Sequence, residues 1–175
     1  MFDREIKIRG IYATHLKQLA KSAEQPYIFD RYIDVYMNAA TIGLLEGEPI
    51  KNPDTSSQDT ATIFLDVITK ERANCVFLYR LVMLLDRSGG LTAEQRIDRA
   101  FRDEGDTAHP EKMEANMKLF NEYVLAGIEI MYDRIAKHSN STEDMCDAAY
   151  EMMKDFQEAN ENTTPEEFLK RYHIL

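Results

Sequence analysis

Apolar residues recur at regular spacing through the N-terminal part of the chain. Residues 3 to 9 alternate charged with apolar side chains, which predicts a short strand that Gly10 ends. Apolar positions then return every three or four residues, and this spacing predicts two helices, at about residues 11 to 24 and 27 to 45. Pro26 separates the two helices because proline lacks the backbone N–H that a helix interior requires.

The middle of the chain joins a polar segment to the most apolar one. Residues 46 to 61 are rich in Pro, Ser, Asp and Thr and show no apolar period, so we expect a long surface loop. From residue 62 to residue 86 the pattern is helical, and the stretch Cys75 to Leu85 is apolar on every side. Such a stretch is typical of a central helix that is surrounded by others.

The C-terminal half carries clear helix start signals. Thr92, with Gln95 three residues later, has the form of a capping box and predicts a short helix. A long amphipathic helix is expected from Pro110 to Ile135, where one face stays apolar. Two more helices are predicted, at about residues 145 to 156 and 164 to 173, and the second of these again begins with a capping box.

The length and composition of the chain fit one helical domain. Its 175 residues and hydrophobic fraction of 44% are sufficient for a buried core. We therefore expect an all-α fold, a single compact bundle of about six or seven helices with a short N-terminal strand, over residues 1 to 175. The N-terminal segment lacks the apolar run of a signal peptide and no stretch is long enough to span a bilayer, so we expect a cytoplasmic protein without membrane association.

Charge is distributed unevenly along the chain, whose formal net charge is -10. Residues 1 to 31 hold six basic and four acidic groups, whereas residues 141 to 167 hold nine acidic groups and one basic group, Lys154. This asymmetry suits an oriented contact with a charged partner, although we favour a solvated acidic face as its explanation.

The sequence contains none of the common motifs for catalysis or cofactor binding. It has no zinc-binding His/Cys pattern, no phosphate-binding glycine loop and no nucleophile elbow, so we predict no catalytic residue, no metal and no cofactor. One acidic arrangement on the long helix makes a magnesium-dependent all-α nucleotide pyrophosphatase an alternative function. Its ligands would be Glu111, Glu114, Glu129 and Asp133. These groups lie largely off the apolar face, which favours a solvated surface instead.

Two features point to interactions of the second and third predicted helices. Asp30, Asp34 and Asn38 repeat every four residues, and we interpret them as the solvent side of the second helix, with a binding role as the alternative. Arg80 interrupts the most apolar helix. Because an unpaired buried charge is costly, we expect Arg80 to be buried and hydrogen-bonded to a carboxylate, for which Asp30 and Asp34 are the candidates.

A row of arginines follows the predicted capping box. Arg96, Arg99 and Arg102 recur every three residues, and acidic residues lie between them. This row could contact a phosphate or an acidic partner, but we favour ion pairing within the helix at a solvated surface.

Three segments carry a resemblance to a known class of proteins. They are FDRYIDVYMNAATIGLLEG at residues 29 to 47, FLYRLVMLLD at 77 to 86 and RIDRAFRDE at 96 to 104. Over about its first 104 residues, the chain resembles small helical proteins that accompany bacterial DNA-modification and phage-defence systems, particularly those associated with DNA phosphorothioation. The resemblance implies a non-enzymatic accessory or assembly role through protein contacts. We therefore expect a protein partner, and a homodimer is one form that the assembly could take.

A DNA-binding regulator is the other alternative function. A strand followed by two helices has the order of a ribbon-helix-helix element, whose paired strands enter the major groove from a dimer. The contacts would then come from Arg4, Lys7 and Arg9 on the strand. The chain departs from that picture in its strong acidity, so we expect no direct binding of the isolated protein to unmodified duplex DNA at physiological salt.

Overall fold

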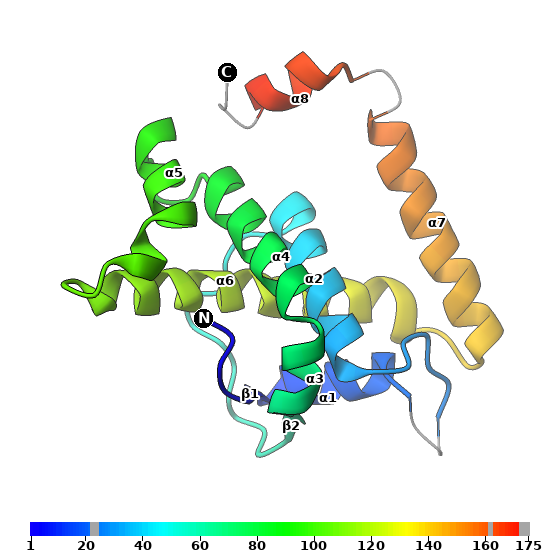
Figure 1. Cartoon of the computed structure of the whole chain (residues 1–175). Helices are drawn as coiled ribbons and strands as arrows, with labels where there is room; N and C mark the ends of the chain where they lie inside the picture. The colour runs from blue at the N-terminus through cyan, green and yellow to red at the C-terminus, as the bar shows by residue number, and fades with distance from the viewer. Residues whose placement is uncertain (22–24, 161–162, 172–175) are drawn as a thin grey trace.

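Helices make up most of the computed structural model, which describes residues 1–21, 25–160 and 163–171 (Figure 1). The elements are β1 (Ile6–Arg9), α1 (Ile11–Leu19), α2 (Tyr32–Glu46), β2 (Thr60–Ile63), α3 (Leu65–Lys70), α4 (Arg72–Leu85), α5 (Ala93–Phe101), the 3-10 turn η1 (Asp103–Gly105), α6 (Pro110–Met131), the π-helix η2 (Tyr132–Ala136), α7 (Thr142–Asn160) and α8 (Pro165–Arg171). The all-α prediction with a short strand is confirmed. Within the described ranges, no helix is both long and apolar enough to cross a bilayer.

The predicted N-terminal strand pairs with a second strand that the sequence pattern did not predict. Strands β1 and β2 are antiparallel, with Ile6 opposite Ile63 and Ile8 opposite Ala61. Ile8, Ala61 and Ile63 are buried, so one face of this small sheet covers the core. The sequence pattern assigned these residues to the loop and to the start of the next helix, because β2 is short and follows a polar segment. Residues 60 to 63 form a strand because β1 pairs with them.

The first two predicted helices are shorter than expected at the ends that the connecting segment joins. Helix α1 ends at Leu19, because the chain turns back and both Ile28 and Phe29 donate backbone hydrogen bonds to the Leu19 carbonyl oxygen, each at 3.1 Å. Helix α2 consequently begins at Tyr32 rather than at residue 27. The predicted end of the first helix at residues 22 to 24, and that of the last helix near residue 173, lie outside the described residues.

Helices α2 and α6 cross with their backbones in contact. A Cβ atom on Gly43 of α2 would lie 1.9 Å from the carbonyl oxygen of Tyr123 in α6. In the reverse direction, a Cβ atom on Gly127 of α6 would lie 1.9 Å from the carbonyl oxygen of Ala39 in α2. Each glycine therefore packs against the carbonyl oxygen of the residue that lies one turn before the glycine of the other helix. A larger residue at either position would force the two helices apart.

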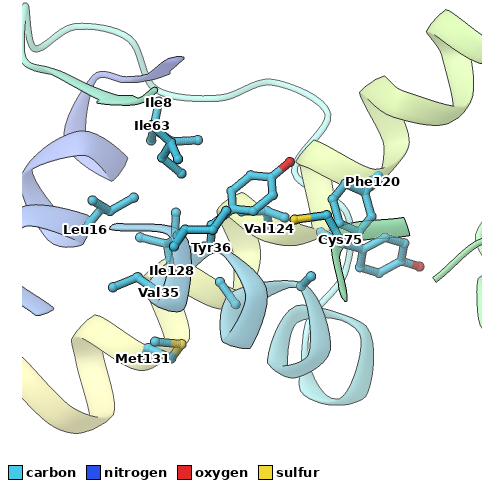
Figure 2. Packing of buried hydrophobic residues seen from close by; sticks show 14 of the residues in the cluster. Ile8, Leu16, Val35, Tyr36, Ile63, Cys75, Phe120, Val124, Ile128 and Met131 are labelled. Carbon is cyan, nitrogen blue, oxygen red and sulfur yellow. The ribbon is translucent and has the colours of Figure 1, made fainter. Parts of the chain in front are cut away.

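Aromatic rings fill the core around this crossing. Tyr36 and Phe120 are fully buried, and the Phe120 ring meets both Phe2 and Tyr36 edge-on, with centroids 5.9 Å apart in each pair. Figure 2 shows Ile8 and Ile63 of the sheet at the upper left of the cluster and Phe120 of α6 at its right, with Tyr36 between them. Tyr36 also donates a hydrogen bond to Asn121 Oδ1 at 2.8 Å, so its buried hydroxyl is satisfied.

The prediction that the segment Cys75 to Leu85 forms a surrounded central helix is wrong. Helix α2 is the central one, because α1, α4 and α6 all pack against it. Helix α4 buries one side, which includes Cys75, Tyr79 and Val82, whereas Phe77 leaves 64% of its surface exposed. Phe77 on the outer side of α4 therefore lacks a covering element among the described residues, whereas Val76, Leu78, Leu81 and Leu84 are partly buried against the core.

Replacing Gly127 tests the backbone contact between α2 and α6. We expect Gly127→Ala to lower the free energy of unfolding by at least about 2 kcal/mol, because the new methyl group collides with the Ala39 carbonyl and overpacks the crossing. Urea denaturation measures this loss. Gly105→Ala is the matched control, since a Cβ atom there meets nothing within 4 Å, and it should change stability by less than about 0.5 kcal/mol. Equal stabilities for the two variants would contradict the proposed close contact.

Candidate functional site

Helix α5 is attached to the rest of the molecule by its arginines rather than by a large apolar face. The predicted capping box starts it, because the Gln95 N–H donates to Thr92 Oγ1 and the Thr92 N–H donates to Gln95 Oε1. One turn from its end, Arg99 reaches the last turn of α4. Its Nη2 donates to the Met83 carbonyl oxygen at 2.7 Å and to Asp86 Oδ2 at 2.9 Å. This arginine therefore fixes α5 against the C-terminal end of α4.

Asp86 is the centre of a buried polar cluster that joins three helices. It follows the last residue of α4 and is 2% exposed. Its Oδ1 accepts hydrogen bonds from Tyr123 Oη of α6 at 2.7 Å, from Ser88 Oγ at 2.7 Å and from the Ser88 N–H at 3.0 Å. Together with Arg99, these donors satisfy both carboxylate oxygens, which a buried charge requires.

The titration behaviour of the cluster follows from this geometry. Burial by itself raises the pKa of Asp86, but the hydrogen bonds from Tyr123, Ser88 and Arg99 together outweigh burial, and the pKa of Asp86 is lowered. The pKa of Tyr123 is raised by burial and by its hydrogen bond to the Asp86 carboxylate. At neutral pH the cluster therefore holds an ionised aspartate and a protonated tyrosine, and both oxygens of the aspartate accept hydrogen bonds.

The outer surface of the same unit is apolar and aromatic. Phe77 of α4 is 64% exposed, and Ile97 and Phe101 of α5 are 45% and 52% exposed. Arg80, one turn after Phe77, places its guanidinium carbon 5.2 Å from the centre of the Phe101 ring. We call the surface formed by Phe77, Arg80, Ile97 and Phe101 the α4–α5 face. It has the two residue types, aromatic and arginine, that are enriched in protein interfaces.

An open cavity of about 640 Å³ lies beside the polar cluster. Ser88 and Tyr123, which donate to Asp86, line it together with Leu44 and Leu85. Lys51 and Arg87 also line it. The cavity lies where the C-terminal ends of α2 and α4 meet.

The prediction for Arg80 is wrong. Its side chain is 39% exposed, and its Nη2 lies 3.8 Å from the carboxylate oxygen Oε2 of Glu104, beyond hydrogen-bonding range. The long arginine side chain extends from the apolar helix to the surface and stacks on Phe101, so its charge needs no buried partner.

The arginine row after the capping box also differs from the sequence interpretation. Arg96 and Arg99 are 4% and 8% exposed, so two of the three point inward, and Arg102 pairs within the helix, with Asp98. The buried ion pair that was expected at Arg80 is formed by Arg99 and Asp86 instead. Sequence reasoning missed Asp86, Ser88 and Tyr123. The Asp-x-Ser spacing directly after an apolar helix was the one local signal, because it allows the aspartate to cap its own turn.

The polar row on α2 lies at the surface, as interpreted. Asp34 accepts two hydrogen bonds from Arg31, at 2.6 and 2.9 Å, and its carbonyl oxygen accepts one from Asn38. Asp30 precedes the helix and lies 3.7 Å from Lys21. These contacts are local, and the structure does not bring the three residues to Arg80.

The basic residues of the N-terminal strand are at the surface. Lys7 forms an ion pair with Glu5 at 2.7 Å, and Arg4 lies 3.8 Å from Asp3. Lys7 and Arg9 are exposed on the face of β1 that points away from the core. One edge of β1 is occupied by β2 of the same chain, whereas a ribbon-helix-helix dimer pairs this strand with its copy.

The four acidic residues of the magnesium alternative are spread along the molecule. Glu111 and Glu129 are at opposite ends of α6, roughly 27 Å apart along the helix axis. Asp133 lies in η2 and forms an ion pair with Lys137 at 2.9 Å. Among the residues that the structure describes, no three His, Cys, Asp or Glu side chains are grouped as metal ligands.

Comparisons with known proteins found no match. No family model matches the chain, and no curated protein and no solved structure is significantly similar to it.

Removing the cation of the buried ion pair tests its role in holding the helices together. We expect Arg99→Met to lower the free energy of unfolding by about 3 kcal/mol, because Asp86 then keeps a buried charge without its counter-ion. Adding Asp86→Asn to this variant should restore part of the loss, since the amide oxygen still accepts from Tyr123 and Ser88. Arg102→Met is the control and should cost less than about 0.5 kcal/mol, because that side chain is exposed. A double variant less stable than Arg99→Met would contradict the ion pair.

The lowered pKa of Asp86 predicts a specific pH dependence. A carboxyl whose folded-state pKa is below its unfolded value, about 3.9, contributes stability above that value and loses it as pH falls through the folded pKa. The stability difference between the wild type and Asp86→Asn should therefore be constant from pH 5 to pH 7, taken as an approximate window, and should shrink below about pH 4. Urea denaturation of both proteins across this range measures it, and a difference independent of pH would show that the Asp86 pKa is not lowered.

Proposed function

We propose that this chain is a non-enzymatic helical accessory protein that acts through protein contacts, and that the α4–α5 face is the contact surface. The observation that carries the proposal is the uncovered side of α4. Its stretch from Cys75 to Leu85 has the composition of a surrounded helix, yet Phe77 is 64% exposed. A helix that is apolar on every side is normally buried on every side, so a partner that covers this face completes the burial.

The side chains of the face support a specific contact. Arg80 over the Phe101 ring combines a cation with an aromatic surface, and such pairs concentrate binding energy in protein interfaces. Ile97 lies one turn before Phe101 on the same helix side and extends the apolar area. Both helices that present these residues are therefore needed to form the surface.

The polar cluster beneath the face supports the same function in another way. Arg99 and Asp86 join α5 to α4, and Tyr123 joins Asp86 to α6. These buried hydrogen bonds hold the two helices in one relative position. A surface that is rigid before binding loses less conformational entropy when the partner arrives.

The sequence resemblance supports a bacterial DNA-modification or genome-defence system as the setting. Two of the three resembling segments, residues 77 to 86 and 96 to 104, contain the α4–α5 face and the Asp86–Arg99 pair. The proposed partner is accordingly a protein component of such a system. The alternatives of a DNA-binding regulator and a magnesium-dependent hydrolase have no observation in their favour beyond the sequence patterns described above.

Co-purification with the proteins encoded beside its own gene tests this function. We expect a stable complex with one DNA-modification or defence protein, and we expect Phe77→Ser combined with Phe101→Ser to abolish it. The matched control is Ile11→Ser, an apolar residue that is 39% exposed at the start of α1. Thermal unfolding of each variant shows that the fold is retained. A complex that survives loss of both phenylalanines would refute the α4–α5 face, and neighbouring genes unrelated to DNA modification or defence would refute the setting.

A further inference from the structure

Helix α7 carries apolar residues on a wider surface than the part that the molecule covers. Two rows of apolar residues run side by side along it, offset by one residue. The inner row consists of Met145, Ala149, Met152 and Phe156, and the outer row consists of Cys146, Tyr150 and Met153. Neighbouring positions are about 100° apart around a helix, so the two rows together cover a far wider arc than the single stripe of an ordinary surface helix.

The body of the protein covers the inner row. Met145 and Met152 are 2% and 3% exposed, and α7 packs on η2. Arg134 of η2 fixes the helix in place, because its guanidinium binds Asp155 of α7 and Glu46 at the end of α2. The orientation of α7 about its own axis is therefore determined by contacts with the same chain.

The outer row remains uncovered in this orientation. Tyr150 and Met153 are 68% and 66% exposed, which makes them more exposed than Phe77, and Cys146 is also exposed. The row keeps the alternating spacing of four and three residues that forms the seam of a coiled coil. This spacing matches a second helix lying along α7.

The charge of α7 determines which helix can occupy that place. Six acidic residues and one basic residue, Lys154, give α7 a net charge of -5. Glu143 and Asp147 lie beside the outer row on the edge that faces away from the body, and Lys154 lies on the same edge. A second copy of α7 would place -5 against -5, and an acidic helix would be repelled in the same way, whereas a helix with lysines and arginines beside its apolar seam is attracted.

We propose that the outer row of α7 is a docking site for a basic amphipathic helix of a partner protein. The site is separate from the α4–α5 face, because Figure 1 shows α7 on the opposite side of the molecule from α5. The inference therefore does not rest on the function proposed above. It adds a second surface, through which one chain could hold two partners at once.

A synthetic amphipathic helix of three Lys/Leu heptads, labelled with a fluorophore, tests the site with the intact chain. We expect binding with a dissociation constant on the order of 10 μM, measured by fluorescence anisotropy. Tyr150→Gln combined with Met153→Gln should weaken it at least about tenfold. Phe64→Gln is the control for loss of an exposed apolar residue outside both proposed surfaces, since Phe64 is 62% exposed, and it should leave the affinity unchanged. Urea denaturation of each variant shows that the fold persists.

A pair of charge variants separates docking from general attraction. Glu143→Gln with Asp147→Asn should weaken binding several-fold and reduce its salt dependence, whereas Glu111→Gln with Glu114→Gln removes the same charge from the start of α6 and should have a much smaller effect. Wild-type affinity in the Tyr150/Met153 variant would overturn the proposal. So would equal binding of a Glu/Leu peptide, or a dimer in sedimentation that this variant dissociates, since the occupant would then be a second copy.

Discussion

Helices α2 and α6 touch backbone to backbone, because Gly43 and Gly127 leave no side chain between them and each meets a carbonyl oxygen of the other helix. This contact determines the position of most other elements. It places Phe120 and Tyr36 together in the core, and it makes α2 the helix against which α1 and α4 also pack. It also fixes α6 along its length, so the Tyr123 side chain extends from the crossing toward the end of α4.

The buried polar cluster depends on that crossing. Tyr123 contributes its backbone carbonyl to the contact with α2 and its hydroxyl to Asp86, so one residue links the helix crossing to the ion pair that holds α5. Arg99 completes the connection from α5. The cluster therefore connects three helices and holds the α4–α5 face in one geometry, in which the Arg80 guanidinium lies over the Phe101 ring.

The two uncovered surfaces have a common physical origin. Both α4 and α7 have apolar residues over a wider arc than a single neighbour can cover, and in both the helix orientation is fixed by polar ties, through Asp86 and through Arg134. The remaining apolar side chains must then face outward, as Phe77 and Tyr150 do. An accessory protein with two such surfaces on opposite sides would be suited to connecting two partners.

The sequence by itself determined the features that depend on hydrogen bonds within one helical turn, and those that depend on the regular spacing of apolar residues. The capping boxes at Thr92 and Thr164 and the all-α class follow from these, since their partners are a few residues away. Only the tertiary structure decided that β2 is a strand, that Arg99 rather than Arg80 forms the buried ion pair, and which side of α4 is covered. Whether a side chain is buried depends on which element packs against it. An arginine in an apolar helix, such as Arg80, can extend to the surface, whereas an arginine in a polar helix, such as Arg99, is buried when another element covers it. The position of that neighbour is determined by contacts between residues far apart in the chain, which periodicity does not encode.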